Sequence, residues 1–157
     1  MLDNKVITIT LVILLGVFVQ VLLVFAEIQD TPDKAVMEFV KSYVRYNDCM
    51  ADRLCEESKV VNDVDVVDEY IYQSHEKAKS LGFSPWYMKD YLKHVSTHVV
   101  KKDFTTATIE LEATISAWPR SFFTGYEKHI EETFELVKED GTWKVCGNPF
   151  NLQQYAE

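Results

Sequence analysis

The chain has 157 residues, a formal net charge of −9, 47% hydrophobic residues and 26% charged residues. This composition is typical of a folded globular protein and excludes a disordered chain. The acidic balance also argues against nucleic acid as a partner, because affinity for phosphates comes from Lys and Arg side chains.

The first predicted element is an uncharged apolar run at residues 6–26, which follows a short leader at residues 1–5. As a helix, such a run covers roughly 30 Å, the hydrocarbon thickness of a bilayer. The apolar region of a cleaved signal peptide is usually shorter, about 7–15 residues. The sequence therefore predicts a retained transmembrane helix, by which the chain would contact the membrane.

One strongly polar side chain, Gln20, interrupts this apolar run. An amide in hydrocarbon tends to find a partner across a helix–helix contact, so Gln20 is a candidate for such a contact. The alternative is that a single amide near the end of a very apolar helix is tolerated without a partner.

The orientation of the predicted helix rests on few charges. Lys5 precedes the run and Lys34 follows it, so the count of basic residues on the two sides is nearly equal. A short leader before a C-terminal domain favours a cytoplasmic N-terminus. We therefore expect a single-pass protein with a linker at residues 27–31 and a periplasmic or extracellular domain at residues 32–147.

The domain is predicted to begin with a helix at about residues 33–47. Thr31 supplies a capping hydroxyl, Pro32 fits the first helical position, and Asp33 suits the positive helix end. Apolar residues recur at helical spacing from Val36 onward and form one buried face.

Further helical segments are predicted between residues 50 and 91. Residues 50–57 are expected to form a short helical piece, and Asn62 or Asp63 is expected to cap a longer helix that ends at Gly82. The pair Ser84-Pro85 is typical of a helix start and predicts a further short helix through about Tyr91.

The second half of the chain changes to the period of β-strands. Apolar and polar residues alternate over residues 105–118, which predicts a long strand with one buried face. A second strand is expected at 128–138, and the turn Asp140-Gly141 joins it to a third at 142–147. With a further strand at 95–100, this order predicts an α+β fold with helices on one face of an antiparallel sheet.

The closing segment ETFELVKEDGTWKVCG, at residues 132–147, carries a family resemblance. Behind a helical first part it resembles the NTF2-like superfamily of cone-shaped α+β domains, and the resemblance covers about residues 32–147. It implies a curved sheet wrapped around the helices, with Trp143 on the concave face. It also implies a non-enzymatic accessory or scaffolding subunit of a membrane protein complex, which would bind a protein partner.

Two other functions follow from the same resemblance. A cone domain can bind a small ligand, and Trp143, Phe134 and Tyr43 are then the candidates to line the pocket. The superfamily also includes isomerases and dehydratases that hold an acid inside the cone. Glu132 has the parity of the apolar strand positions, so it is a candidate base if it points inward. A strand irregularity would instead leave Glu132 exposed.

No cofactor or metal is predicted. His94 and His98 lie four residues apart and would share a face within a regular strand, an arrangement compatible with a metal pair. The other two histidines are distant in sequence, and the chain has no CxxC, HExxH, P-loop or GxGxxG motif.

Three cysteines bear on the redox state of the chain. Residues six apart in an unbroken helix are separated by roughly 9 Å, too far for a disulfide. A helix break at Asn47 would permit the pair Cys49–Cys55 in an oxidising compartment and leave Cys146 free. The alternative is three reduced thiols.

The C-terminal tail at residues 148–157 lacks any regular period. Phe150, Leu152 and Tyr155 are its large apolar side chains, and they are candidates to dock on the domain or on a partner.

Overall fold

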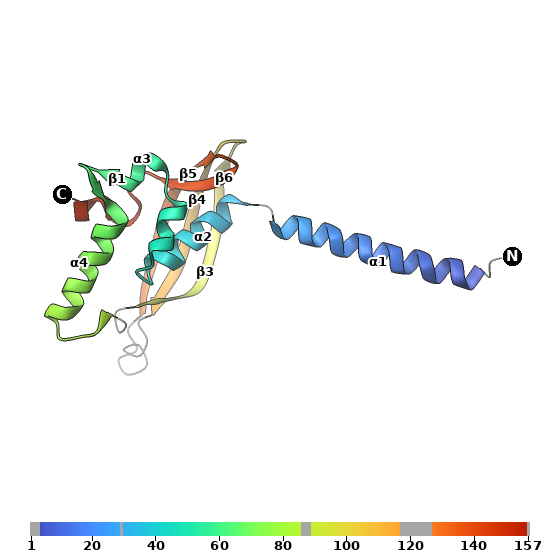
Figure 1. Ribbon diagram of the computed structural model, residues 1–157, viewed down its shortest axis with the longest axis horizontal. Helices are drawn as coiled ribbons and strands as arrows, with labels where there is room; N and C mark the ends of the chain where they lie inside the picture. Colours follow the sequence, from blue (N-terminus) through green and yellow to red (C-terminus); the bar gives the residue numbers. More distant parts are fainter. Residues whose placement is uncertain (1–3, 29, 86–88, 117–126, 157) are drawn as a thin grey trace. The chain divides into compact units, whose positions relative to one another are not determined.

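The computed structural model describes residues 4–28, 30–85, 89–116 and 127–156. The chain divides into two compact units, Met1–Asp30 and Thr31–Glu157 (Figure 1).

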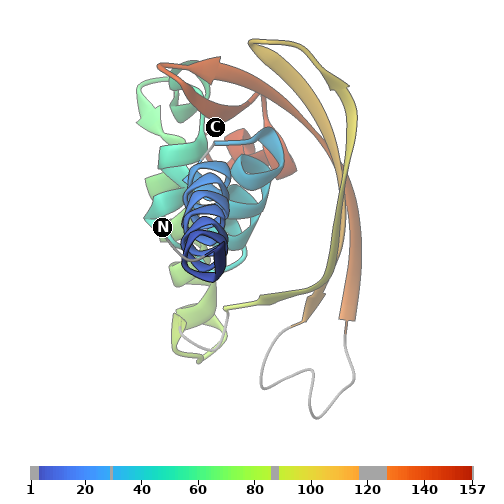
Figure 2. The same cartoon turned by 90° about the vertical axis from the view of Figure 1, so that its right-hand side faces the viewer.

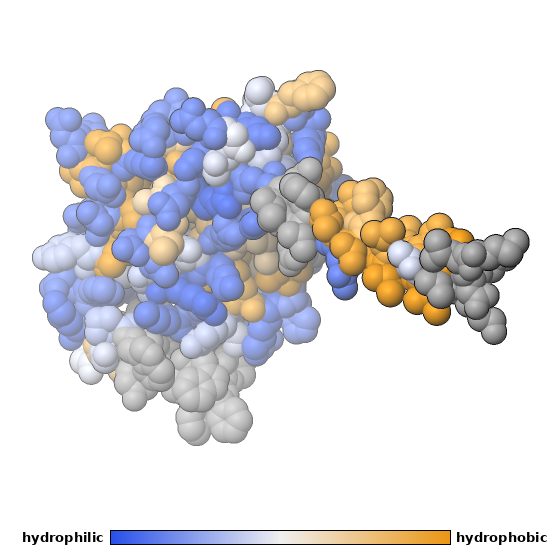
Figure 3. All heavy atoms as spheres, turned by 45° about the vertical axis from the view of Figure 1, so that its right-hand side comes forward, coloured by the Kyte–Doolittle hydropathy of each residue, from blue (hydrophilic) through white to orange (hydrophobic). Residues whose placement is uncertain are grey.

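The first unit consists of helix α1, Asn4–Ile28, whose side chains are described from Ile7 to Leu23. Each of these side chains is exposed, including Gln20. Figure 3 shows apolar residues along this helix. No partner for Gln20 is described, so its role in a helix–helix contact stays a prediction.

The predicted membrane anchor requires correction. Among the described residues, no helix is long and apolar enough to cross a bilayer. This finding overturns the predicted transmembrane helix at residues 6–26 and the single-pass placement that depended on it.

The second unit begins with helix α2, Pro32–Tyr43. The Thr31 hydroxyl accepts a hydrogen bond from the Lys34 amide at 3.3 Å, and Pro32 occupies the first turn, so the predicted helix start is confirmed. The helix ends earlier than predicted, because Tyr46 adopts a left-handed backbone (φ 53°) and the Asn47 amide turns back to the Ser42 carbonyl.

Two short elements replace the single piece predicted at residues 50–57. They are the 3₁₀-helix η1, Asp48–Arg53, and the one-turn helix α3, Glu56–Lys59. Leu54 lies between them in extended conformation (φ −92°, ψ 145°) and separates the two turns.

The predicted cap of the next helix was wrong by a few residues. Asn62 and Asp63 both adopt left-handed backbones and turn a small hairpin between β1, Val60–Val61, and β2, Val64–Asp65. Asp65 is the cap instead, and its carboxylate accepts from the amides of Val67 and Asp68 at 2.9 and 3.0 Å. Helix α4 spans Val66–Ser80.

Helix α4 ends as predicted near Gly82. Gly82 has φ +75°, and the amide of Phe83 donates to the Ala78 carbonyl at 2.9 Å. The predicted helix from Ser84 falls partly on residues 86–88, outside the described residues, and its expected end at Tyr91 was wrong because a strand begins there.

Four strands form one antiparallel sheet in the order β3-β4-β5-β6, so the predicted meander is confirmed. The turn between the last two strands holds Asp140 and Gly141 at φ 48° and 82°, as a tight hairpin with two left-handed residues requires. Trp118, at the predicted end of the long strand 105–118, lies outside the described residues. The bounds are β3 Tyr91–Lys102, β4 Thr106–Ser116, β5 Glu127–Glu139 and β6 Thr142–Cys146.

The helices lie on one side of this curved sheet (Figure 2), which makes the domain an α+β fold. Helix α2 contacts β3, β4 and β6 and buries Phe39 and Val40 against them. Ile109 pairs opposite Phe134 across the strands, and both are buried on this inner face.

Strand β3 is irregular at two places. The pairing with β4 shifts between Lys93 and Ser96, where His94 has φ 49°, and again between Val99 and Lys101. Each shift is a bulge, which twists this edge of the sheet.

Trp143 anchors the last strand in the core, where its side chain is only 3% exposed. Trp143→Ala should therefore lower the free energy of unfolding by about 3–5 kcal/mol, because it deletes a large buried side chain. Glu110→Ala on the outer face is the matched control and should cost under about 0.5 kcal/mol. Urea unfolding measures both, and an unchanged midpoint for Trp143→Ala would contradict the burial.

Candidate functional site

Glu132, the candidate acid, lies on the inner face of the sheet. It pairs directly opposite Leu111, which is fully buried, and residues opposite one another in adjacent strands share a face. Its side chain is half-buried, and its charge contributes to raising the pKa of Tyr43. The catalytic role of Glu132 stays a prediction.

The other predicted pocket residues separate into two environments. Trp143 and Phe134 are almost completely buried and belong to the hydrophobic core. The Lys138 ammonium lies 5.8 Å from the Trp143 ring centroid, within cation–π range. Tyr43 is half-buried at the edge of the core and is the member of the predicted set that lies closest to solvent.

Tyr43 belongs to a cluster of aromatic rings on the inner side of the sheet. Its ring stacks on Tyr70 with centroids 4.7 Å apart and on Phe150 at 4.5 Å. Phe39 and Phe134 border the same group, and Phe150 meets Phe134 edge to face at 5.4 Å. Offset and edge-to-face rings at these separations stabilise a core beyond the area that they bury.

The phenol groups of this cluster favour their neutral forms. Burial raises the pKa of Tyr43 to about 12, although a hydrogen bond from Tyr70 acts in the opposite direction. Burial also raises the pKa of Tyr70, and the neighbouring Tyr43 adds to that rise. At neutral pH these side chains therefore offer hydroxyl donors and apolar rings rather than charge.

The C-terminal tail docks on its own domain. The segment Pro149–Ala156 forms the 3₁₀-helical stretch η3 along α4, and Leu152 is 1% exposed within the core. Phe150 joins the aromatic cluster, and Tyr155 meets Tyr70 edge to face at 5.1 Å. The sequence indicated this contact only through the three large apolar residues of the tail, Phe150, Leu152 and Tyr155.

The outer face of the sheet carries a small acidic hollow of about 160 Å³. Glu112 and Glu131 lie directly opposite each other in β4 and β5, and His129 lies 3.4 Å from Glu112. The residues that line the hollow are Ser96, His98, Glu110, Glu112 and Glu131.

The histidine pair considered as a metal site is split by the first bulge of β3. His94 has a left-handed backbone at the register shift, whereas His98 lies in regular pairing opposite Glu110. Across the described residues, no three His, Cys, Asp or Glu side chains converge in a way that would hold a metal ion.

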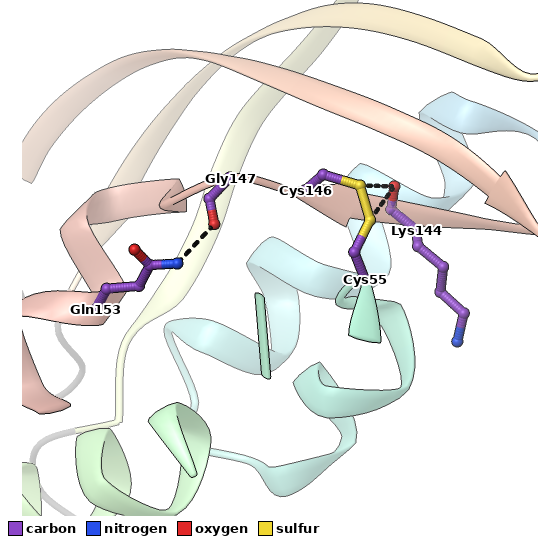
Figure 4. The surroundings of a disulfide bond; sticks show 5 residues. All are labelled: Cys55, Lys144, Cys146, Gly147 and Gln153. Atoms are coloured by element: carbon purple, nitrogen blue, oxygen red, sulfur yellow. Dashed lines mark hydrogen bonds between the residues drawn. A yellow bond between two sulfur atoms is a disulfide. The ribbon is translucent and has the colours of Figure 1, made fainter. Parts of the chain in front are cut away.

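The disulfide joins Cys55 to Cys146, and Cys49 is free and exposed, so the predicted pair Cys49–Cys55 was wrong. The reason is a long-range contact. The Cys55 amide donates to the Val145 carbonyl at 2.9 Å, which brings the Cα atoms of Cys55 and Cys146 within 5.1 Å, a normal disulfide separation. Figure 4 shows both sulfurs beside the Lys144 carbonyl oxygen.

A second hollow, of about 320 Å³, lies between α2 and η1 and includes Cys49. Arg53 lines it and forms an ion pair with Glu38, another lining residue, at 2.6 Å. The same guanidinium donates to the Trp143 carbonyl at 3.3 Å, so Arg53 joins the helical layer to β6.

No protein-family profile matches the chain, and no curated protein sequence matches it.

The disulfide closes a loop with a sequence separation of 91 residues. A link across so long a loop restricts the unfolded chain strongly, so reduction should lower the free energy of unfolding by about 3–5 kcal/mol. Cys49→Ser should leave the free energy of unfolding unchanged. A thiol reductant should lower the free energy of unfolding of this variant as much as that of the unaltered chain. Thiol labelling of the unfolded, unreduced chain should modify Cys49 alone; a label on Cys55 or Cys146 would contradict the linkage.

The raised pKa of Tyr43 predicts alkaline sensitivity. The folded state favours the neutral phenol of Tyr43, whose pKa rises from 10 in the unfolded chain to about 12. This preference stabilises the fold fully below pH 10, and the stabilisation is lost as the pH rises toward 12. Tyr43→Phe keeps the ring and removes the ionisable hydroxyl, so its free energy of unfolding should fall less between pH 10 and 12. Both proteins should carry Cys49→Ser, which prevents thiolate attack on the disulfide. Equal slopes would contradict the assignment.

Proposed function

We propose that the chain is a non-enzymatic accessory or scaffolding subunit whose NTF2-like domain binds a protein partner through the outer face of its sheet. The observation that carries the proposal is the like-charged pair Glu112 and Glu131, held directly opposite each other on that face. Like charges at opposite positions destabilise a sheet. Residues that destabilise the local structure in this way are typical of functional sites, here a site that binds a partner.

The outer face has the charge pattern of a protein-binding surface. Glu110 also lines the hollow, and Glu135 is exposed on the same side of β5. Two lysines nearby are engaged by other acids, since Lys93 pairs with Glu127 at 3.0 Å and Lys101 with Asp103 at 3.5 Å. A complementary partner would therefore present Lys or Arg side chains, and its association rate would fall with rising salt.

The NTF2-like assignment is supported by the order and curvature of the elements. Helices come first in the domain, and four antiparallel strands then curve around them (Figure 2). Trp143 of the last hairpin lies on the inner, concave side, as the family pattern requires.

The test separates binding from folding. Glu131→Lys removes the repulsion with Glu112, so it should leave the midpoint of urea unfolding unchanged or slightly raised. The same substitution should weaken partner binding about tenfold or more at low salt. Glu57→Lys, an exposed acid on α3, is the matched control for the change in charge and should leave binding unchanged.

The whole chain is purified under non-denaturing conditions from cells that produce it. Native mass spectrometry then determines whether a second chain is bound. A second chain in fixed ratio is expected, and a photo-crosslinking residue at Thr133 on the outer face should capture it. The same crosslinker at Glu57 should not. A lone monomer, or equal capture from both positions, would refute the proposal.

A further inference from the structure

The docked tail is held to the domain by side chains. Phe150, Leu152 and Tyr155 supply its contacts with the aromatic cluster and the core. Its polar groups bond back to its own beginning, since the Gln153 amide donates to the Asn148 side chain at 2.7 Å and the Asn151 amide donates to the Asn148 carbonyl at 3.2 Å. Segments fastened by few side chains open locally at lower cost than strands or core helices.

The backbone of the docked tail is also unfavourable by itself. Phe150 and Asn151 have φ values of 53° and 55°, in the left-handed region that residues with a side chain rarely adopt. For a bulky residue such as Phe this conformation is energetically unfavourable. Docking of the side chains must offset that cost. Gly147, at φ +82°, precedes the tail and can turn without the same penalty.

The Phe150 ring occupies a slot with aromatic walls. Tyr43 stacks on it with an interplanar angle of 21°, Phe39 lies nearly parallel at 6.5 Å, and Phe134 presents its edge. Phe150 is half-buried, so the slot opens to solvent on one side. A flat ring stacks on the Tyr43 face and meets the edge of Phe134, so these surroundings favour an aromatic side chain.

We propose that residues 149–156 form a detachable strap, and that the slot beneath Phe150 is a binding site for a small molecule with a single aromatic ring. Such a ligand replaces the Phe150 ring when the strap lifts. The site is distinct from the outer sheet face and is closed in this structure by the chain's own tail.

The disulfide limits how far the strap can move. Cys146 is tied to Cys55, and Figure 4 shows Gly147 directly after it, with its carbonyl accepting from Gln153 at 3.3 Å. Opening therefore begins beyond β6 and leaves the strand pairing of Val145 intact. The walls of the slot belong to elements outside the strap, so they stay in place when it opens.

Competition between strap and ligand has a measurable consequence in the unaltered protein. A ligand that binds only the open form increases the population of that form. Phenol should therefore accelerate amide hydrogen exchange of Asn151 and Gln153, whose amides are bonded when the strap is closed. Exchange of Ile109 and Leu111 in β4 should not accelerate. Cyclohexanol, similar in size but without an aromatic face, should have no such effect.

A variant provides the second measurement. Leu152→Ala weakens the hold of the strap and leaves Tyr43, Phe39 and Phe134 in place, so the population of the open form should rise about 30-fold or more. The apparent affinity for phenol should rise by the same factor, up to the point at which the strap is mostly open. Phe134→Leu keeps an apolar wall without the ring edge and should weaken phenol binding in the Leu152→Ala background.

Three results would overturn the proposal. The first is phenol affinity equal in the unaltered chain and in Leu152→Ala. The second is exchange of the tail amides only together with β4, which would make the tail part of one cooperative core. The third is equal binding of phenol and cyclohexanol, which would remove the preference for an aromatic ring.

Discussion

The attachment of Leu54 and Cys55 to the edge of β6 is the constraint on which the rest of the domain depends. A backbone hydrogen bond to Val145 and the disulfide to Cys146 join the segment between η1 and α3 to the last strand. Arg53 reinforces the same junction through the Trp143 carbonyl. Because β6 closes the sheet and leads directly into the tail, this junction sets the position of both.

The two faces of the sheet meet different physical demands. The inner face is closed by Phe39, Phe134 and Leu136, and packing there tolerates few substitutions. The outer face carries Glu112 and Glu131 opposite each other, and the repulsion between two like charges does not stabilise the fold. One sheet therefore has a buried apolar face that stabilises the fold and an opposite face that carries charged side chains.

Local patterns predicted much of the fold. The alternation around Ile109 and Glu110, the Asp140-Gly141 turn and the Thr31-Pro32 helix start each depend on neighbours in sequence, and each agrees with the structure. Asn62 and Asp63 form a left-handed turn instead of capping the next helix, because the residue types that cap helices also favour such turns.

The errors at the candidate site have a different origin. The predicted Cys49–Cys55 pair was based on spacing along the chain alone, whereas the observed bond depends on a contact with β6. The place of Phe150 in the aromatic cluster likewise requires the tail to return to α2, and no periodicity within the tail indicates that return. Long-range pairings of this kind are fixed by tertiary packing, which a local pattern does not encode.

The bulged strand β3 affects how copies of the domain behave toward one another. An outer strand with free backbone groups is a template onto which another chain can add, and Val99 and Val100 make this one partly apolar. Two interruptions in register and the adjacent Lys101 and Lys102 disturb the regular row of donors and acceptors that such growth needs. The irregular edge thus disfavours the addition of a strand from a second copy of the domain.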